Sequence, residues 1–478
     1  MAAAYEAPRN DAERTFCDIF ASILQMDKVG ATDNFFELGG TSLVVTRVII
    51  EADKAGMHVA YGDVFANPTP RQLAALVTGS PAEGPGADEV AHYDYTAINN
   101  LLQFNTLDSF RKGERLTLGD VLLTGATGYL GIHILRQLID SDAGNIYCLV
   151  RGKTKEKAES RLRTLLFYYF SNAYKELFGS RIHIVLGDVT EDFDPTLKVD
   201  TVFNCAAIVK HFSEGTEIED VNIGGARRCV EYCIRTGARL VHVSTASTRG
   251  LWAGEIRDDV FTEQRFYMGQ YLGNKYIFSK FMAERLILEA VALHGLSAKI
   301  MRVGNLAARS TDGEFQANFS TNSFMGRIKV YNMLGCCPYS MRNKRVEFSP
   351  INEVSNAIVL LATTPDTCTV FHPYNIHTQF LGDVLTGLSA VGDGIRFVEQ
   401  EEFAEAMDAA KDDPKKAKQM SSLLAYQNMA HGQKTADVAR DNDYTTQVLY
   451  RLGFTWSPTS WDYIERMLTT IGGFGFFE

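Results

Sequence analysis

Apolar residues near the N-terminus recur every three or four positions. Phe16, Phe20 and Ile23 follow this spacing, which predicts an amphipathic helix over residues 10–26. Two further stretches of helical period follow, and the second starts at an Asn-Pro-Thr-Pro sequence that is typical of a helix boundary. The pattern therefore predicts a small all-α, four-helix bundle over residues 1–79.

Beyond this unit the pattern changes to short apolar runs separated by helical stretches. The runs have the length of buried strands and lie at residues 121–123, 146–150, 182–186, 201–203, 240–243 and 298–301. Strands that alternate with helices form a parallel sheet covered on both faces. We therefore predict an α/β, Rossmann-like, doubly wound parallel sheet.

Local composition divides the chain further. Residues 80–94 are rich in proline, glycine and acidic residues and have no period, which predicts a flexible linker. We assign the sheet core to residues 95–365, with residues 305–345 contributing to a substrate lobe. The mostly helical residues 366–478 are assigned to a C-terminal substrate-binding lobe.

Bulk composition excludes several classes of protein. Apolar residues make up 46% of the chain, which allows large cores, and the net charge of −11 argues against a nucleic-acid partner. The sequence has no membrane-spanning apolar run and no signal peptide, so we expect a cytoplasmic protein without a membrane partner. The eight cysteines form no C-x-x-C pair, and we predict no metal site.

A glycine-rich turn follows the first predicted strand. Gly125, Gly128 and Gly131 have the spacing G-x-x-G-x-x-G and precede a predicted helix. Such glycines let the main chain approach a pyrophosphate, whose charge the helix N-terminus stabilises. The turn therefore predicts a dinucleotide site, and we expect further contacts to the cofactor from Thr127, Tyr129 and Leu130.

The end of the next strand indicates which dinucleotide binds. Arg151 stands twenty residues after the last glycine, where an acid would select NAD and an arginine suits the 2′-phosphate of NADP. Arg161 is expected to add to this pocket. Asp188 and Val189 end the third strand, where the aspartate meets the adenine or simply forms a turn. A surface role for Arg151 is the alternative, and we favour NADPH.

Three residues in the second half of the chain form a candidate catalytic set. Tyr276 and Lys280 make a Y-x-x-x-K pattern, which places both side chains on one helix face. The Lys280 ammonium would lower the pKa of the phenol and make Tyr276 a proton donor. Thr245 follows a strand and is placed to hold a carbonyl oxygen, although Ser247 is close enough to be the alternative.

A separate motif lies in the N-terminal helical unit. The run Asp33-Asn34-Phe35-Phe36-Glu37-Leu38-Gly39-Gly40-Thr41-Ser42-Leu43 resembles the core motif of peptidyl carrier domains. This resemblance implies that Ser42 carries a 4′-phosphopantetheine arm. The simpler reading, in which Ser42 only caps a helix, explains less of the run.

From about residue 118 onward the chain resembles the extended short-chain dehydrogenases/reductases. More narrowly, it is similar to the terminal thioester reductase domains of nonribosomal peptide synthetases. Besides the glycine turn and Y-x-x-x-K, this resemblance rests on residues 204–212, 221–222, 302–306, 312–316 and 346–351. It implies that NADPH reduces a peptidyl or aminoacyl thioester held on Ser42, releasing an aldehyde or, after a second hydride, an alcohol. It also implies that Lys280 holds the nicotinamide ribose of the cofactor.

The implied partners and the competing functions follow from the same resemblance. A phosphopantetheinyl transferase would load Ser42, and upstream adenylation and condensation modules would supply the acyl group to a monomeric protein. Three alternatives stay open. They are a cyclising release domain without redox chemistry, an epimerase or dehydrogenase acting on a free small molecule, and a carrier-docking module without activity.

Overall fold

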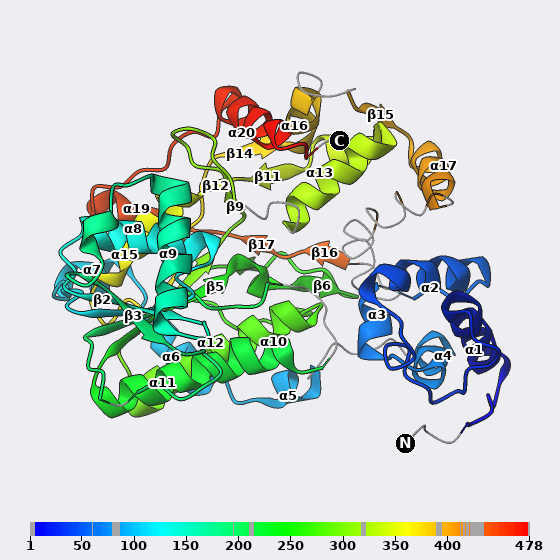
Figure 1. Ribbon diagram of the computed structural model, residues 1–478, viewed down its shortest axis with the longest axis horizontal. Helices are drawn as coiled ribbons and strands as arrows, with labels where there is room; N and C mark the ends of the chain where they lie inside the picture. Colours follow the sequence, from blue (N-terminus) through cyan, green and yellow to red (C-terminus); the bar gives the residue numbers. More distant parts are fainter. Residues whose placement is uncertain are drawn as a thin grey trace.

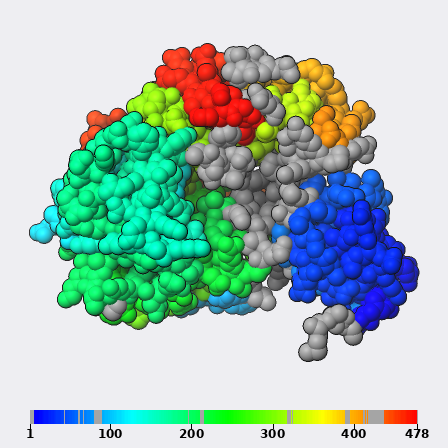
Figure 2. Space-filling view, in the orientation of Figure 1, coloured from blue at the N-terminus to red at the C-terminus, as the bar shows by residue number. Residues whose placement is uncertain are grey.

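The computed structural model describes residues 5–59, 61–78, 87–194, 196–209, 215–316, 322–388, 394–411, 413, 416, 420 and 435–476 (Figure 1). Within these ranges no helix has the length and apolar character needed to cross a membrane. The N-terminal helices form a mass of their own beside the sheet domain (Figure 2).

The N-terminal unit has the predicted helical architecture. Phe35 from the loop is fully buried, and its ring lies 4.7 Å from that of Phe20, which also packs in this core. The third helix has only six residues, too few to produce a period in the sequence. The four helices are α1 (Asp11–Leu24), α2 (Ser42–Lys54), α3 (Tyr61–Ala66) and α4 (Pro70–Thr78).

The sheet domain is built on a parallel sheet of seven strands, which confirms the predicted fold class. Its spatial order places β1 between β4 and β2, so the order reverses at this point. Ligands of such folds bind at the carboxyl ends of the strands beside the reversal. The order is β13 (Val370–Phe371), β8 (Ala298–Val303), β5 (Arg239–Thr245), β4 (Thr201–Asn204), β1 (Val121–Thr124), β2 (Ile146–Val150) and β3 (Ile182–Leu186).

Helices cover both faces of the sheet and bury two apolar cores. The central strands β1 and β4 are fully buried because each face packs against helices, which explains their continuous apolar runs. One face carries α8 (Tyr129–Asp140), α9 (Lys155–Phe170), α15 (Ile351–Ala362) and α19 (Asp443–Arg451). The other carries α6 (Thr96–Leu102), α11 (Gly225–Thr236) and α12 (Lys275–His294).

Part of the segment that composition predicts to be a linker is helical. α5 (Ala87–His92) packs on the second core through Val90, which is 3% exposed. Arg285 of α12 binds Glu89 and lies over the Tyr93 ring. Residues 89–94 are therefore attached to the sheet domain, because Val90 and the tyrosines add apolar contacts that the polar composition hides. Residues 79–86 lie outside the described part of the chain.

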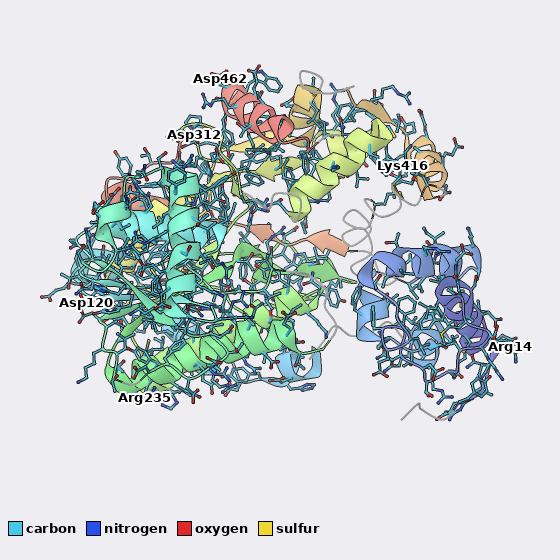
Figure 3. All side chains as sticks on the ribbon, viewed as in Figure 1. Arg14, Asp120, Arg235, Asp312, Lys416 and Asp462 are labelled. Carbon is cyan, nitrogen blue, oxygen red and sulfur yellow. The ribbon has the colours of Figure 1, made fainter. Side chains whose placement is uncertain are left out.

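A second lobe lies above the carboxyl ends of the strands (Figure 1). Its core combines residues 307–348 with residues 381–420 and 463–476, so it is assembled from separate parts of the chain. Figure 3 places Asp312 and Asp462 in this lobe, and Asp120, directly before β1, on the side away from the N-terminal unit. Its main elements are α13 (Ser323–Leu334), β11 (Arg345–Glu347), β14 (Thr378–Phe380), α16 (Leu381–Gly387), α17 (Gln400–Lys411) and α20 (Trp461–Gly473).

Short paired strands connect the lobe to the sheet domain. They bring distant segments side by side. The pairs are β9 (Leu306–Ala307) with β12 (Ser349–Pro350), β6 (Leu251–Ala253) with β16 (Thr435–Asp437), and β7 (Val260–Phe261) with β17 (Ala439–Arg440).

Candidate functional site

The glycine turn joins β1 to α8, and each glycine has a distinct physical role. Gly125 has a φ of +70°, and a Cβ there would lie 2.6 Å from the main-chain nitrogen of Ala206. A Cβ on Gly131 would lie 2.1 Å from the carbonyl oxygen of Gly125. Gly125 therefore fixes the turn and Gly131 lets α8 pack against it.

Gly128 serves the helix end instead. It is exposed, stands at the N-cap of α8, and no side chain of the described residues caps this end. The first N–H groups of α8 are thus available to an anion, which the helix dipole also favours. The glycine turn and the first N–H groups of α8 therefore suit the pyrophosphate that the sequence predicts.

The three candidate catalytic residues line one cavity together with the glycine turn. The cavity has a volume of about 910 Å³ and runs from Gly128 past Thr245, Tyr276 and Lys280 to the lobe at Phe348. Thr245 ends β5, whereas Tyr276 and Lys280 lie one turn apart on α12. The side chain of Asn274 caps α12 by accepting a hydrogen bond from Ile277, which fixes where this helix begins.

Thr245 and Ser247 differ in their surroundings. Thr245 is buried, and its hydroxyl oxygen accepts a hydrogen bond from the Ser247 main-chain N–H at 3.1 Å. Its own hydroxyl hydrogen stays available to a carbonyl oxygen in the cavity. The Ser247 side chain is exposed, although it also lines the cavity. The fixed hydroxyl of Thr245 is the better preorganised donor.

Lys280 is a buried lysine without a direct carboxylate partner among the described residues. It is 2% exposed, and its Nζ donates to the carbonyl oxygen of Val243 at 2.6 Å. Burial lowers the pKa of Lys280 to about 8, although the charge of Glu284 acts in the opposite direction. Glu284 itself binds Arg302 at 2.8 Å, and all of these groups are fully or almost fully buried.

The residues predicted to hold the adenosine end lie apart from this cavity. Arg151 and Asp188 lie just past the ends of the neighbouring strands β2 and β3, and their side chains approach to 3.7 Å. Asp188 also accepts hydrogen bonds from the N–H and hydroxyl of Thr190, which is the turn role left open by the sequence. Val189 is buried with its side chain against Gly225, and Arg161 is exposed on α9.

Three other predicted contacts of the cofactor lie in the glycine turn or at the start of α8. The Tyr129 hydroxyl donates to the carbonyl oxygen of Ala307 at 3.1 Å, and burial holds the pKa of Tyr129 well above its ordinary value. Leu130 is buried but still lines the cavity, and Thr127 is half-buried in the turn. Tyr129 thus ties the glycine turn to the lobe.

The Ser42 motif forms a tight turn before α2. Gly39 has a φ of +97°, and a Cβ on Gly40 would lie 2.4 Å from the ring of Phe35. Asn34 accepts a hydrogen bond from Phe36, which shapes the loop leading to the turn. The motif residues therefore place Ser42 at the start of α2, whereas its side chain lies outside the described part of the structure.

Several polar residues that line the cavity were not predicted from the sequence as site residues. Its lobe end carries Glu347, which is 4% exposed and accepts from Arg440 at 2.9 Å and from the Asn305 main-chain N–H at 3.0 Å. Arg440 comes from β17, more than ninety residues away in the chain. The pairing of β17 with β7 creates this contact, and no local signal in the sequence predicts it.

Comparisons with known proteins identify the families that the two parts of the chain resemble. Residues 14–77 match the phosphopantetheine attachment site family, and residues 123–358 match an NAD-binding family described as male sterility protein. The chain is 37% identical to a thiolation-reductase di-domain from an archaeal non-ribosomal peptide synthetase. That comparison covers 99% of this chain and 100% of the other, with a TM-score of 0.88.

Two further relatives cover most of the chain. The reductase domain of the aureusimine biosynthetic cluster is 26% identical, with a TM-score of 0.67 over 80% of this chain and 98% of its own. The isonitrile lipopeptide synthase of Mycobacterium tuberculosis is 28% identical over 79% of this chain. The chain spans only 17% of the length of that synthase.

Proposed function

The chain belongs to the thiolation-reductase di-domains of nonribosomal peptide synthetases, and on that premise we propose that it releases a carrier-bound acyl group by reduction. The substrate is a peptidyl or aminoacyl thioester on the phosphopantetheine arm of Ser42. The product is an aldehyde, or an alcohol after a second reduction. The observation that carries the proposal is the single cavity shared by the glycine turn, Thr245, Tyr276 and Lys280.

The glycine turn and the free N-terminus of α8 would hold the cofactor pyrophosphate, and Arg151 would hold the 2′-phosphate of NADPH. When bound, NADPH supplies a hydride to the thioester carbonyl carbon. This choice of NADPH over NADH rests on Arg151, whose side chain is 72% exposed and approaches Asp188 only to 3.7 Å.

The hydroxyls of Thr245 and Tyr276 donate hydrogen bonds to the thioester oxygen as it gains negative charge. Tyr276 then gives its proton to this oxygen, and the neighbouring Lys280 ammonium stabilises the phenolate that remains. The Tyr276 phenolate takes the hydroxyl proton back as the carbon–sulfur bond breaks, which frees the aldehyde. The thiolate left on the carrier is protonated from solvent. Burial of Lys280 strengthens its electrostatic effect on the phenol because little water screens it.

We also propose the partners that this chemistry requires. A phosphopantetheinyl transferase loads Ser42, and upstream adenylation and condensation modules deliver the acyl group. The reducing cytoplasm suits a chain whose eight cysteines are all free thiols.

The experiment that tests the proposal compares Tyr276→Phe with Tyr271→Phe. Both tyrosines line the cavity, but only Tyr276 precedes Lys280 by one helical turn. With acyl-loaded protein, Tyr276→Phe should lower NADPH oxidation and aldehyde release together by about 10²–10⁴-fold, the usual contribution of a general acid. Tyr271→Phe should keep most activity. Full turnover by Tyr276→Phe would remove its assigned role, and acyl release without NADPH oxidation would favour a cyclising release domain.

A further inference from the structure

Three buried polar side chains lie side by side across the centre of the sheet. Thr124 of β1 is in register with Asn204 of β4, and Asn204 is in register with His242 of β5. All three are at most 2% exposed. Thr124 donates to Asn204 at 2.7 Å, and the Asn204 amide nitrogen lies 3.1 Å from His242 Nδ1. Polar groups buried in a sheet are stable only when they are hydrogen-bonded in this way.

The row ends at the lysine of the candidate catalytic set. His242 Nε2 lies 3.4 Å from Lys280 Nζ. His242 and Ser244 point from the same face of β5 toward α12, where Ser244 contacts Glu284. Arg302 compensates the charge of Glu284. The polar side chain that faces the Lys280 amine from the sheet is therefore the imidazole of His242. The other ionisable groups near Lys280 are Cys205, whose pKa burial raises to about 12, and Tyr276 on its own helix.

The hydrogen-bond directions along the row assign the imidazole proton. The Ala206 N–H donates to the Thr124 oxygen at 3.2 Å, so the Thr124 hydrogen is free to bind the Asn204 oxygen. In this amide orientation Asn204 donates to His242 Nδ1. A neutral imidazole then carries its proton on Nε2, directed at Lys280.

This arrangement couples the position of the proton on the His242 ring to the protonation of Lys280. An Nε2–H group cannot accept a hydrogen bond. It can donate one to a neutral Lys280 amine, but it destabilises a Lys280 ammonium, which has only hydrogens to offer. An ammonium at Lys280 needs Nε2 as an acceptor. That requires the proton on Nδ1 and the Asn204 amide turned so that its oxygen faces the ring. In that orientation the Thr124 hydrogen loses its acceptor in the row.

We propose that His242 is a positioning residue for the reduction, and that its tautomer sets the protonation state of Lys280. The Nε2–H tautomer accompanies the neutral amine, and the Nδ1–H tautomer accompanies the ammonium. His242 itself stays neutral, because burial and the neighbouring Lys280 hold the pKa of His242 well below its ordinary value. The role of His242 in catalysis rests on the function proposed above, whereas the coupling of the two side chains does not.

Kinetics of His242→Gln test the catalytic part. A glutamine oxygen facing Nζ accepts from the ammonium without any change of tautomer, so the charged form of Lys280 gains stability. The fall of kcat/KM at high pH should therefore move at least one pH unit upward. His183→Gln is the matched control, because His183 lies on β3 of the same sheet and bonds Asn145 away from the cavity. An unmoved pH profile in His242→Gln, or an equal loss at every pH, would overturn the proposal.

Nitrogen NMR of the full chain with labelled histidine tests the coupling without catalysis. The His242 signal is identified among the ten histidines by its absence in His242→Gln. We expect the ring to change from Nδ1–H to Nε2–H as the pH rises through about 8, the pKa to which burial lowers Lys280. Lys280→Met should abolish this change. If the His242 ring keeps one tautomer at every pH, the coupling is refuted even where thioester reduction is observed. If the tautomer changes in a protein that does not reduce the thioester, only the proposed function is refuted.

Discussion

Replacing Gly131 by alanine inserts a methyl group between α8 and the turn that precedes it. The new Cβ would lie 2.1 Å from the Gly125 carbonyl oxygen, whereas ordinary contact begins at 3.4 Å. The first turn of α8 must therefore move by about 1 Å. Overpacking of this kind costs about 1–3 kcal/mol of unfolding free energy. The same displacement moves the first N–H groups of α8 away from the position expected for the pyrophosphate, so NADPH should bind more weakly.

Gly128→Ala is the matched comparison because it adds the same methyl group one helical turn earlier. Its Cβ would lie 3.3 Å from the same oxygen, at an exposed position, so the fold needs only a small adjustment. The methyl group instead occupies the end of α8 where the pyrophosphate is expected. We therefore expect near-normal unfolding free energy and about tenfold weaker NADPH binding, equivalent to about 1.4 kcal/mol.

Denaturant unfolding and fluorescence titration with NADPH separate the two effects. Gly131→Ala should lose both stability and cofactor affinity, and Gly128→Ala should lose affinity alone. If Gly131→Ala unfolds and binds NADPH like the wild type, the close packing of α8 on the turn does not position the cofactor.

Three further predictions concern the rest of the site. Thr245→Val should lower kcat by about 10²–10³-fold, the usual cost of losing one oxyanion donor, whereas Ser247→Ala should keep most activity. If single-turnover assays show the reverse order, Ser247 and not Thr245 holds the carbonyl oxygen. Arg151→Ala should raise KM for NADPH much more than KM for NADH, and equal effects would remove the argument for the 2′-phosphate. Activity should fall as the pH rises through about 8, because deprotonation of Lys280 removes the ammonium, and a profile flat to pH 10 would contradict a lysine of lowered pKa.

The main architecture could be predicted from the sequence because buried parallel strands leave continuous apolar runs. All six predicted strands are present, and the seventh, β13, has two residues and leaves no pattern. The glycine turn, Thr245 and the Tyr276–Lys280 pair could be proposed from the sequence because each depends on local spacing. The topology of the fold then brings them to one cavity.

Contacts that depend on strand order could not be predicted in the same way. The row of Thr124, Asn204 and His242 exists because β4 lies between β1 and β5, an order that no local pattern in the sequence contains. Arg440 reaches Glu347 only because β17 pairs with β7. The helix α5 was hidden by its polar composition, since its attachment depends on Val90 and an ion pair to α12.

Reductive release from the carrier is tested most directly by one loading experiment. The chain is loaded with an acyl-phosphopantetheine arm and mixed with NADPH, and NADPH oxidation and the released product are measured in one turnover. We expect equal amounts of oxidised NADPH and aldehyde at early times, none from Ser42→Ala, and normal amounts from Thr41→Ala, whose side chain caps no N–H of α2. Acyl release without NADPH oxidation, or unchanged aldehyde formation by Ser42→Ala, would contradict the account.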